Sequence, residues 1–448
     1  MDEKNAPPAA DAPSSSSEAP IVLRSRILLP ISGPPCDNGA VLISGNRIRK
    51  VGTWNEIARE SRGDVMDLGD SILLPGLINA HCHLDYTGMA GLLPPQKRFT
   101  DWIKLMLAAK AEWNYTEFAE SWLQGAQMLV RTGTTTVVDF EAVPELLPDV
   151  WSATPLRVHS VLEMTGVRSR RSPESILNEA LQRADHLHDG RSCTGLAPHA
   201  PYSTAPELIR IAAEAARERH WLLSIHVSES VLEFDMFQHA RGEMFDWLKR
   251  NERDMSDCGH GSPIRQLASL DALGPNLLAV HLNYIDAADP ALLATHGAHV
   301  VHCPRSHFYF QHADFPIHDL QHAGVNVCLG TDSLATVYKR RHDSVELSMF
   351  DEMSCFAEKF SGVNPKDILR MATVNGARAL QLQGQAGELI EGALADVIAI
   401  PYDGPIQQAS EAAVNHRGGV MASMIEGQWA ITPQGAPTRA SYDTGSVS

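Results

Sequence analysis

The sequence lacks CxxC pairs, and no apolar run approaches the length of a membrane-spanning helix. Its seven cysteines are odd in number and scattered, which excludes a disulfide framework and a zinc ribbon. Unpaired cysteines are typical of a reducing, intracellular compartment, so we expect a cytoplasmic protein. Residues 1–20 also lack the apolar segment of a secretory signal, and we expect disordered tails at residues 1–20 and 432–448.

Basic residues are scarce as well. The chain has 37 Lys and Arg against 54 Asp and Glu, for a net charge of −17. No basic patch stands out, so we expect no nucleic-acid partner, because such binding depends on clustered positive charge. The missing membrane-length run likewise excludes a membrane partner. At 448 residues with 44% hydrophobic content, the chain can bury a large core.

What the sequence does contain is an alternation of short apolar strands with helical stretches. Such an alternation predicts an α/β protein with a (β/α)8, TIM-like barrel over residues 73–384. The expected strands are Leu74–His83, Thr134–Phe140, Leu156–Met164, Thr194–Pro198, Leu222–His226, Leu277–His281, His299–Cys303 and Asn326–Gly330. The expected helices include Phe118–Arg131, Pro206–Arg219, Val231–Lys249 and Asn364–Leu380.

Short strands with turns lie on both sides of this region. We expect residues 21–72 and 385–431 to combine in one composite β-sandwich, because a few isolated strands are only marginally stable.

Candidate metal ligands stand at the carboxyl ends of the expected strands. His81 and His83 alternate along the first strand and therefore point to one side. His226 and His281 end the fifth and sixth strands, and Asp332 follows the eighth. This end of a barrel carries the active site. Three imidazoles and a carboxylate suit one divalent metal ion, Zn²⁺ or Fe²⁺, with room for a water.

Proton transfer needs a further group, and Glu229 follows His226 by three residues. There it can overhang a water on the metal and carry its proton to a leaving group. His281 could ligate the metal or polarise the attacking water. We favour the second role, because His81, His83, His226 and Asp332 already complete a mononuclear ligand set.

These motifs together resemble the amidohydrolase superfamily. They are Pro75–His83 (PGLINAHCH), His226–Glu229 (HVSE), the strand-six His281 and Gly330–Asp332 (GTD). The similarity is greatest to the branch of cytosine, guanine and S-adenosylhomocysteine deaminases and of chlorohydrolases. It implies a barrel with a composite β-sandwich, the ligand and proton-transfer roles given above, and a small-molecule substrate. A homodimer is also compatible with it.

Strand four lacks the lysine that dinuclear members of the superfamily use, which favours a single metal. The resemblance instead places His199 at a substrate-contacting position. His199 could equally be a loop histidine that bonds to the backbone.

Two short motifs indicate a candidate substrate. Cys303–His307 (CPRSH) and Gly330–Ala335 (GTDSLA) resemble aminodeoxyfutalosine deaminases, which convert an adenine ring to hypoxanthine in menaquinone biosynthesis. The pattern departs at His307, where the branch usually has Asn, and at Thr336. Arg305 and Trp102 are further candidates for substrate contact, with Arg305 equally suited to pairing with a surface acid.

On this interpretation Glu229 protonates the ring nitrogen, Asp332 accepts a proton from water, and His281 stabilises the developing oxyanion. Alternatives are a deaminase of S-adenosylhomocysteine, methylthioadenosine or guanine, or a chlorohydrolase. A non-catalytic scaffold that has lost the metal is a further alternative, against which the six intact site residues argue.

Overall fold

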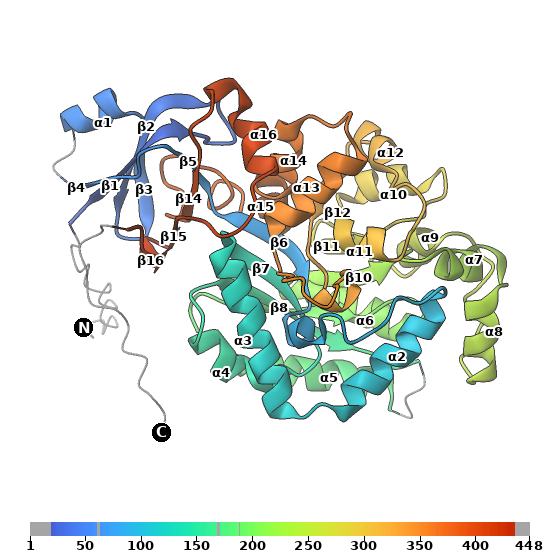
Figure 1. The fold of residues 1–448 in the computed structure, drawn as a ribbon. Helices are drawn as coiled ribbons and strands as arrows, with labels where there is room; N and C mark the ends of the chain where they lie inside the picture. Colours follow the sequence, from blue (N-terminus) through green and yellow to red (C-terminus); the bar gives the residue numbers. More distant parts are fainter. Residues whose placement is uncertain (1–18, 61–62, 168–170, 188, 435–448) are drawn as a thin grey trace, which may run out of the picture.

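The computed structural model describes residues 19–60, 63–167, 171–187 and 189–434. It contains a barrel surrounded by helices and, beside it, a second sheet built from both ends of the chain (Figure 1). The tails expected at residues 1–20 and 432–448 fall largely outside the described residues. Within the described ranges, no helix combines the length and apolar character that a membrane crossing requires.

Eight parallel strands form the barrel in chain order, as predicted. They are β6 (Leu77–Cys82), β7 (Thr134–Glu141), β8 (Arg157–Met164), β9 (Cys193–Pro198), β10 (Leu223–Val227), β11 (Leu277–His281), β12 (His299–His302) and β13 (Asn326–Leu329). The last strand returns to the first: the N–H groups of Thr331 and Asp332 donate to His81 O at 2.9 and 3.1 Å. The α/β class and the TIM-like barrel are therefore confirmed.

The first expected strand, Leu74–His83, is wrong in extent. The chain forms two strands here: β5 (Ser71–Pro75) belongs to the second sheet, and β6 starts at Leu77. Gly76 separates them because the backbone passes directly over Thr135, where a Cβ at position 76 would lie 2.2 Å from the threonine side chain. A single apolar run thus serves two sheets.

The helices after α1 lie around the barrel and at its rim, whereas α1 packs on the second sheet (Figure 1). The helices are α1 (Trp54–Glu60), α2 (Phe99–Glu112), α3 (Tyr115–Arg131), α4 (Leu147–Ser152), α5 (Pro173–Ala184), α6 (Pro206–Glu218), α7 (Val231–His239), α8 (Glu243–Arg250), α9 (Pro263–Ser269), α10 (Asp289–His296), α11 (Pro304–Tyr309), α12 (Ile317–His322), α13 (Met349–Lys359), α14 (Pro365–Met371), α15 (Val374–Ala379) and α16 (Ala409–Val414).

Two of the expected helices are interrupted. The stretch Val231–Lys249 breaks between α7 and α8, where Ala240 and Gly242 have φ values of 50° and 101°. Such left-handed backbone ends a helix. The stretch Asn364–Leu380 breaks at Thr373, whose ψ of −100° is not helical. The break after α7 lets α8 project beside the barrel mouth (Figure 1).

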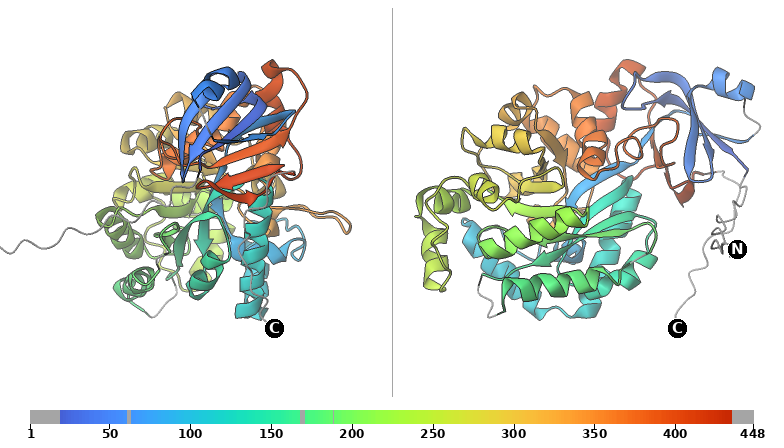
Figure 2. Two further views of the ribbon diagram at one scale, coloured as in Figure 1. Left: turned by 90° about the vertical axis from the view of Figure 1, so that its left-hand side faces the viewer. Right: turned by 180° about the vertical axis from the view of Figure 1, so that it is seen from behind.

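The second sheet joins strands from both ends of the chain, as predicted (Figure 2). It is one continuous mixed sheet, because β1 pairs with β2 and, further along, with β5. Its strands are β1 (Ile21–Leu28), β2 (Cys36–Ser44), β3 (Arg47–Thr53), β4 (Asp64–Asp67), β5, β14 (Val397–Pro401), β15 (Ala422–Ile425) and β16 (Gln428–Ile431).

A buried ion pair ties this sheet to the barrel. Arg157, at the start of β8, donates to Asp396 Oδ2 at 2.6 Å and to Glu426 Oε1 at 2.7 Å. The Arg157 and Asp396 side chains are almost fully buried. This contact lies at the amino end of the barrel strands and leaves their carboxyl ends open for a site.

Candidate metal centre

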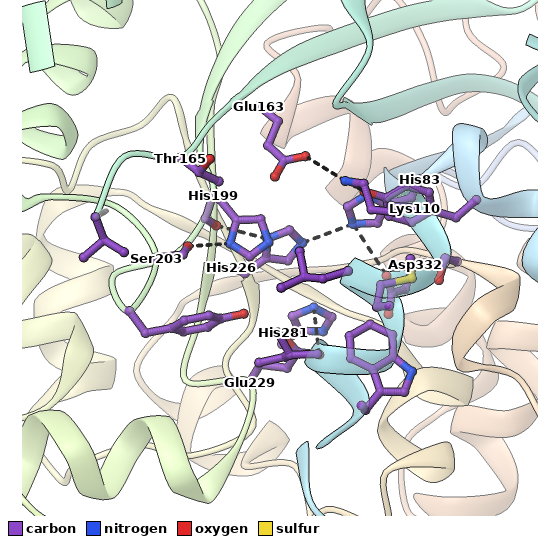
Figure 3. Close-up of a pocket in the computed structure, with 18 of the residues that line it drawn as sticks. His83, Lys110, Glu163, Thr165, His199, Ser203, His226, Glu229, His281 and Asp332 are labelled. Carbon is purple, nitrogen blue, oxygen red and sulfur yellow. Dashed lines mark hydrogen bonds and ion pairs between the residues drawn. The ribbon is translucent and has the colours of Figure 1, made fainter. Parts of the chain in front are cut away.

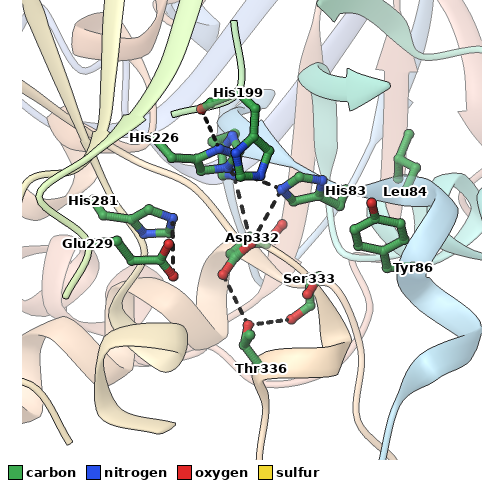
Figure 4. Close-up of polar contacts among 12 residues, drawn as sticks. His83, Leu84, Tyr86, His199, His226, Glu229, His281, Asp332, Ser333 and Thr336 are labelled. Atoms are coloured by element: carbon green, nitrogen blue, oxygen red, sulfur yellow. Dashed lines mark hydrogen bonds and ion pairs between the residues drawn. The ribbon is translucent and has the colours of Figure 1, made fainter. Parts of the chain in front are cut away.

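Three imidazoles converge at the carboxyl end of the barrel (Figure 4). The Nε2 atom of His226 lies 3.3 Å from Nε2 of His81 and 3.3 Å from Nε2 of His83. Two nitrogens bound to one tetrahedral Zn²⁺ at about 2.05 Å would stand about 3.3 Å apart. The three rings are thus already spaced as ligands of a single ion.

Asp332 completes this cluster. Its Oδ1 lies 3.8 Å from Nε2 of both His81 and His83. The ligating atoms of His81, His281 and Asp332 also fall within 4.8 Å of one another. His226 Nδ1 lies 3.0 Å from the His199 carbonyl, which leaves Nε2 free to face the cluster. The structure therefore places His81 close to each of the other predicted ligands, and the donor atoms of the cluster fit a divalent cation.

Burial controls the charges of this cluster. It holds the pKa values of His83 and His226 well below the usual range and lowers that of His281 to about 3. Neutral imidazoles are the form that binds a metal. Burial alone would raise the pKa of Asp332, but the hydrogen bond from His81 and the neighbouring imidazoles outweigh it and hold that pKa low. The carboxylate is thus ready to ligate.

Glu229 lies beside His281, with 3.8 Å between Oε1 and Nε2 (Figure 4). Burial, and next the charge of Asp332, raise the pKa of Glu229 well above its usual range. A carboxyl group with a raised pKa can donate as well as accept a proton near neutrality. This position and this raised pKa would suit a proton carrier, a role that stays a prediction here.

The backbone of Glu229 is held from two sides. Its N–H donates to Glu233 Oε2 at 3.0 Å, and its carbonyl accepts from Asn283 Nδ2 at 2.9 Å. Asn283 Oδ1 in turn lies 2.9 Å from His307 Nδ1. The preceding residue, Ser228, has a left-handed φ of 52°, which these contacts stabilise.

Strain of the same kind appears elsewhere at the cluster. His281 and Asp332 have φ values of 74° and 52°. Non-glycine residues adopt this conformation rarely, and they do so mostly where the surrounding structure enforces it for function. The two strand ends are thus turned so that both side chains face the metal centre.

A cavity of about 240 Å³ opens above the cluster (Figure 3). Its inner end contains His83, His226, Glu229, His281 and Asp332. Its outer wall is largely apolar and comes from α2 and α8: Trp102, Ile103, Met106, Leu107, Trp247 and Leu248.

The structure separates the three predicted substrate contacts. His199 and Trp102 line the cavity, where contact with a substrate stays a prediction. Arg305 is not among its lining residues. Its Nε donates to Glu352 Oε1 at 2.5 Å and its Nη1 to the Glu346 carbonyl at 2.9 Å. Because Glu352 is fully buried, this arginine is held in an ion pair away from the cavity lining, and its contact with a substrate stays a prediction without support from this geometry.

Several cavity residues were missed by the sequence analysis: Tyr86, Lys110 and Glu163. Tyr86 stacks on the His83 ring, with centroids 5.0 Å apart and 6° between planes. Glu163 stands at the carboxyl end of β8, so the strand-end rule applied to the histidines could have found it. Lys110 lies on α2, and no pattern in the sequence links it to the site.

Comparisons with known proteins agree with this site. Residues 72–430 match the amidohydrolase family. The 5-methylthioadenosine/S-adenosylhomocysteine deaminase of Saccharophagus degradans is 30% identical, over 87% of this chain and 85% of the relative.

Two solved structures share the fold. An adenosine deaminase from Xanthomonas campestris with bound zinc has a TM-score of 0.79 at 22% identity, covering 92% of each chain. The aminofutalosine deaminase of Helicobacter pylori, in complex with methylthio-coformycin, has a TM-score of 0.80 at 20% identity, covering 92% of this chain and all of that one. The chain thus belongs to the amidohydrolase family, as a hydrolase of carbon–nitrogen bonds other than peptide bonds.

Proposed function

We propose that this protein deaminates adenine nucleosides and that it does so with one Zn²⁺ held by His81, His83, His226 and Asp332. One observation carries the proposal: the carboxyl group of Glu229 lies 3.8 Å from His281, at the inner end of the cavity that holds the imidazole cluster. Hydrolysis of a ring amidine requires a proton carrier beside a metal centre, in a cavity that admits the ring.

Each residue of the site has its own role in the proposed deamination. When bound, the divalent cation supplies hydroxide near neutral pH by lowering the pKa of water. The water oxygen adds to C6 of the adenine, and the C6–N6 bond then breaks to give hypoxanthine and ammonia. Glu229 takes one proton from the water and delivers it to the ring nitrogen N1. Asp332 accepts the second proton of the water as the oxygen becomes the carbonyl, and this proton returns through Glu229 to the leaving amino group, so that both protons leave in the products. His281 stabilises the negative charge that develops on oxygen.

The outer wall of the cavity favours substrates with an apolar 5′ group. Trp102, Met106 and Trp247 face the cavity there, and an apolar substituent buried against them gains about 25 cal/mol per Å². The name of the Saccharophagus degradans relative includes a substrate of this kind, methylthioadenosine. We therefore place methylthioadenosine first, and keep aminodeoxyfutalosine, favoured by the sequence motifs, as a candidate.

A deamination assay with Zn²⁺-loaded protein tests the proposal. Methylthioadenosine, 5′-deoxyadenosine, S-adenosylhomocysteine, adenosine, aminodeoxyfutalosine and guanine are compared by the ultraviolet change from adenine to hypoxanthine and by ammonia release. We expect turnover of the adenine nucleosides, with the highest kcat/KM for methylthioadenosine. Metal-loaded protein that releases no ammonia from any of them would refute the proposal.

A further inference from the structure

Glu163 is a carboxylate without a hydrogen-bond donor. Its side chain faces the cavity and is 13% exposed, and its charged neighbour is the Lys110 ammonium at 3.8 Å (Figure 3). In the part of the chain that the structure describes, no N–H or O–H group donates to its oxygens. Carboxylates this buried normally accept several hydrogen bonds. The carboxylate at this cavity therefore has an ion-pair partner in Lys110 but no hydrogen-bond donor among the described residues.

Lys110 is fixed beside this carboxylate. Its ammonium forms a short hydrogen bond with the Tyr86 hydroxyl, and it lies over the Tyr86 ring at 4.8 Å from the centroid. Tyr86 in turn stacks on His83. The Tyr86 ring therefore connects the Lys110–Glu163 pair to His83 and fixes the position of the pair relative to the metal centre.

The pair lies across the cavity from the groups that would act on the ring. Glu163 lies in β8, whereas Glu229 follows the end of β10 and His281 ends β11 (Figure 3). An adenine whose C6 amino group faces Glu229 turns its opposite edge, with N9, away from that carboxyl. The substituent on N9 then reaches the side where Glu163 and Lys110 stand.

The charges of the pair select the chemistry of that substituent. A singly charged group would meet one attractive and one repulsive partner in this pair, so the pair favours neither charge. A neutral hydroxyl can donate to the carboxylate and accept from the ammonium at once. Two neighbouring hydroxyls match the two oxygens of one carboxylate, which is a bidentate acceptor. The site is thus built for an uncharged vicinal diol.

We propose that Glu163, positioned by Lys110, accepts the hydrogen bonds of the 2′- and 3′-hydroxyls of the substrate ribose, and so restricts this enzyme to ribonucleosides. The inference deepens the proposed function and rests on it. It makes Glu163 a specificity-determining residue that touches the sugar and takes no part in proton transfer at the ring.

Removing one sugar hydroxyl at a time tests the inference. We compare kcat/KM for adenosine, 2′-deoxyadenosine and 3′-deoxyadenosine in the unaltered protein and in Glu163→Gln. A hydrogen bond to a charged group contributes about 1.5–3 kcal/mol, so the unaltered protein should prefer adenosine by about 10- to 100-fold. Glu163→Gln should reduce this preference to about threefold or less, mainly by slowing adenosine.

The matched control is Glu174→Gln, the same substitution at an exposed acid in the first turn of α5. It should keep the full preference for adenosine. A protein that handles the three nucleosides alike, or a Glu163→Gln variant that keeps the preference, would overturn the inference.

A binding measurement separates this inference from the proposed function. Calorimetry compares inosine with 2′-deoxyinosine on Zn²⁺-loaded protein, without any turnover. Tighter binding of inosine that is lost in Glu163→Gln supports the sugar site even if no nucleoside is deaminated, in which case the proposed function fails alone. Deamination of adenine nucleosides with equal binding of the two inosines would leave the function intact and overturn the sugar site.

Discussion

Replacing Asn283 with alanine should slow catalysis without touching substrate or metal. Asn283 follows β11 by two residues and is almost fully buried. Its side-chain N–H donates to the Glu229 carbonyl at 2.9 Å, and its side-chain oxygen contacts His307. The Asn283→Ala substitution removes the hold on one side of the Glu229 peptide while Glu233 keeps the other. We expect the carboxyl group of Glu229 to lose its fixed position.

The magnitude follows from the groups left without partners. The Glu229 carbonyl and a ring nitrogen of His307 would both be buried and unbonded, at about 1–3 kcal/mol for each such group. If one of these costs raises the activation free energy by its full amount, kcat drops by about 5- to 150-fold. KM and the Zn²⁺ content should stay unchanged, because Asn283 does not line the cavity.

A double-mutant cycle identifies the route of the effect. If Asn283 acts only through Glu229, then Asn283→Ala should cost almost nothing in kcat once Glu229→Gln is present. The control is Asn276→Ala, just before β11, where the side chain donates to the Trp221 carbonyl at the far end of the strand. It should lower stability and leave kcat intact. Equal losses from Asn283→Ala in both backgrounds would refute the reasoning.

Four further outcomes follow from the structure. Glu229→Gln should retain the metal but lower kcat by about 10²–10⁴-fold, and normal turnover would remove Glu229 from proton transfer. Asp332→Ala should lower both metal content, measured by atomic emission, and rate; full metal with normal rate would contradict its role as a ligand. Arg305→Ala leaves the buried Glu352 without its ion-pair partner and should lower the free energy of unfolding in urea by about 3–5 kcal/mol. KM should stay unchanged, whereas a raised KM would indicate that Arg305 contacts the substrate. Burial lowers the pKa of His159 to about 4, below the unfolded value of about 6.5, so its contribution to stability is complete above pH 6.5 and is lost as the pH falls toward 4. Between pH 7 and pH 5, the free energy of unfolding should therefore fall by about 2 kcal/mol less in His159→Gln than in the unaltered protein. An equal fall in the two proteins would be inconsistent with a neutral buried ring.

The ligand set was predictable because it follows one local rule. Residues two apart on a strand share a face, and parallel strands in a barrel end at the same rim. His81, His83 and His226 could therefore be placed together without knowing the packing. The rule also reaches Asp332, because it lies three residues beyond the end of the last strand. Glu163 obeys the same rule but was overlooked, since a single glutamate at a strand end carries no motif.

Other features depend on partners far along the chain. Arg305 pairs with Glu352, 47 residues later, so its sequence neighbours cannot distinguish an ion pair from a substrate contact. The division of Leu74–His83 depends on Thr135, which approaches Gly76 from another strand. Lys110 reaches the cavity only because α2 crosses the barrel mouth. Tertiary packing determines each of these three features, and local sequence patterns carry no information about that packing.

The division of the second sheet between the two ends of the chain has a consequence for synthesis on the ribosome. β5 ends at Pro75, and its neighbour β14 begins at Val397, about 320 residues later. At about 5–20 residues per second, the nascent chain carries the unfinished sheet for roughly 15–65 s. Its unpaired edge can recruit strands from other chains throughout that time. The barrel strands, by contrast, emerge in the order in which they pair. The non-catalytic sheet therefore determines how long each new molecule is prone to aggregation. Slower or cooler expression with chaperones should reduce aggregation mainly by protecting the unpaired edge of that sheet.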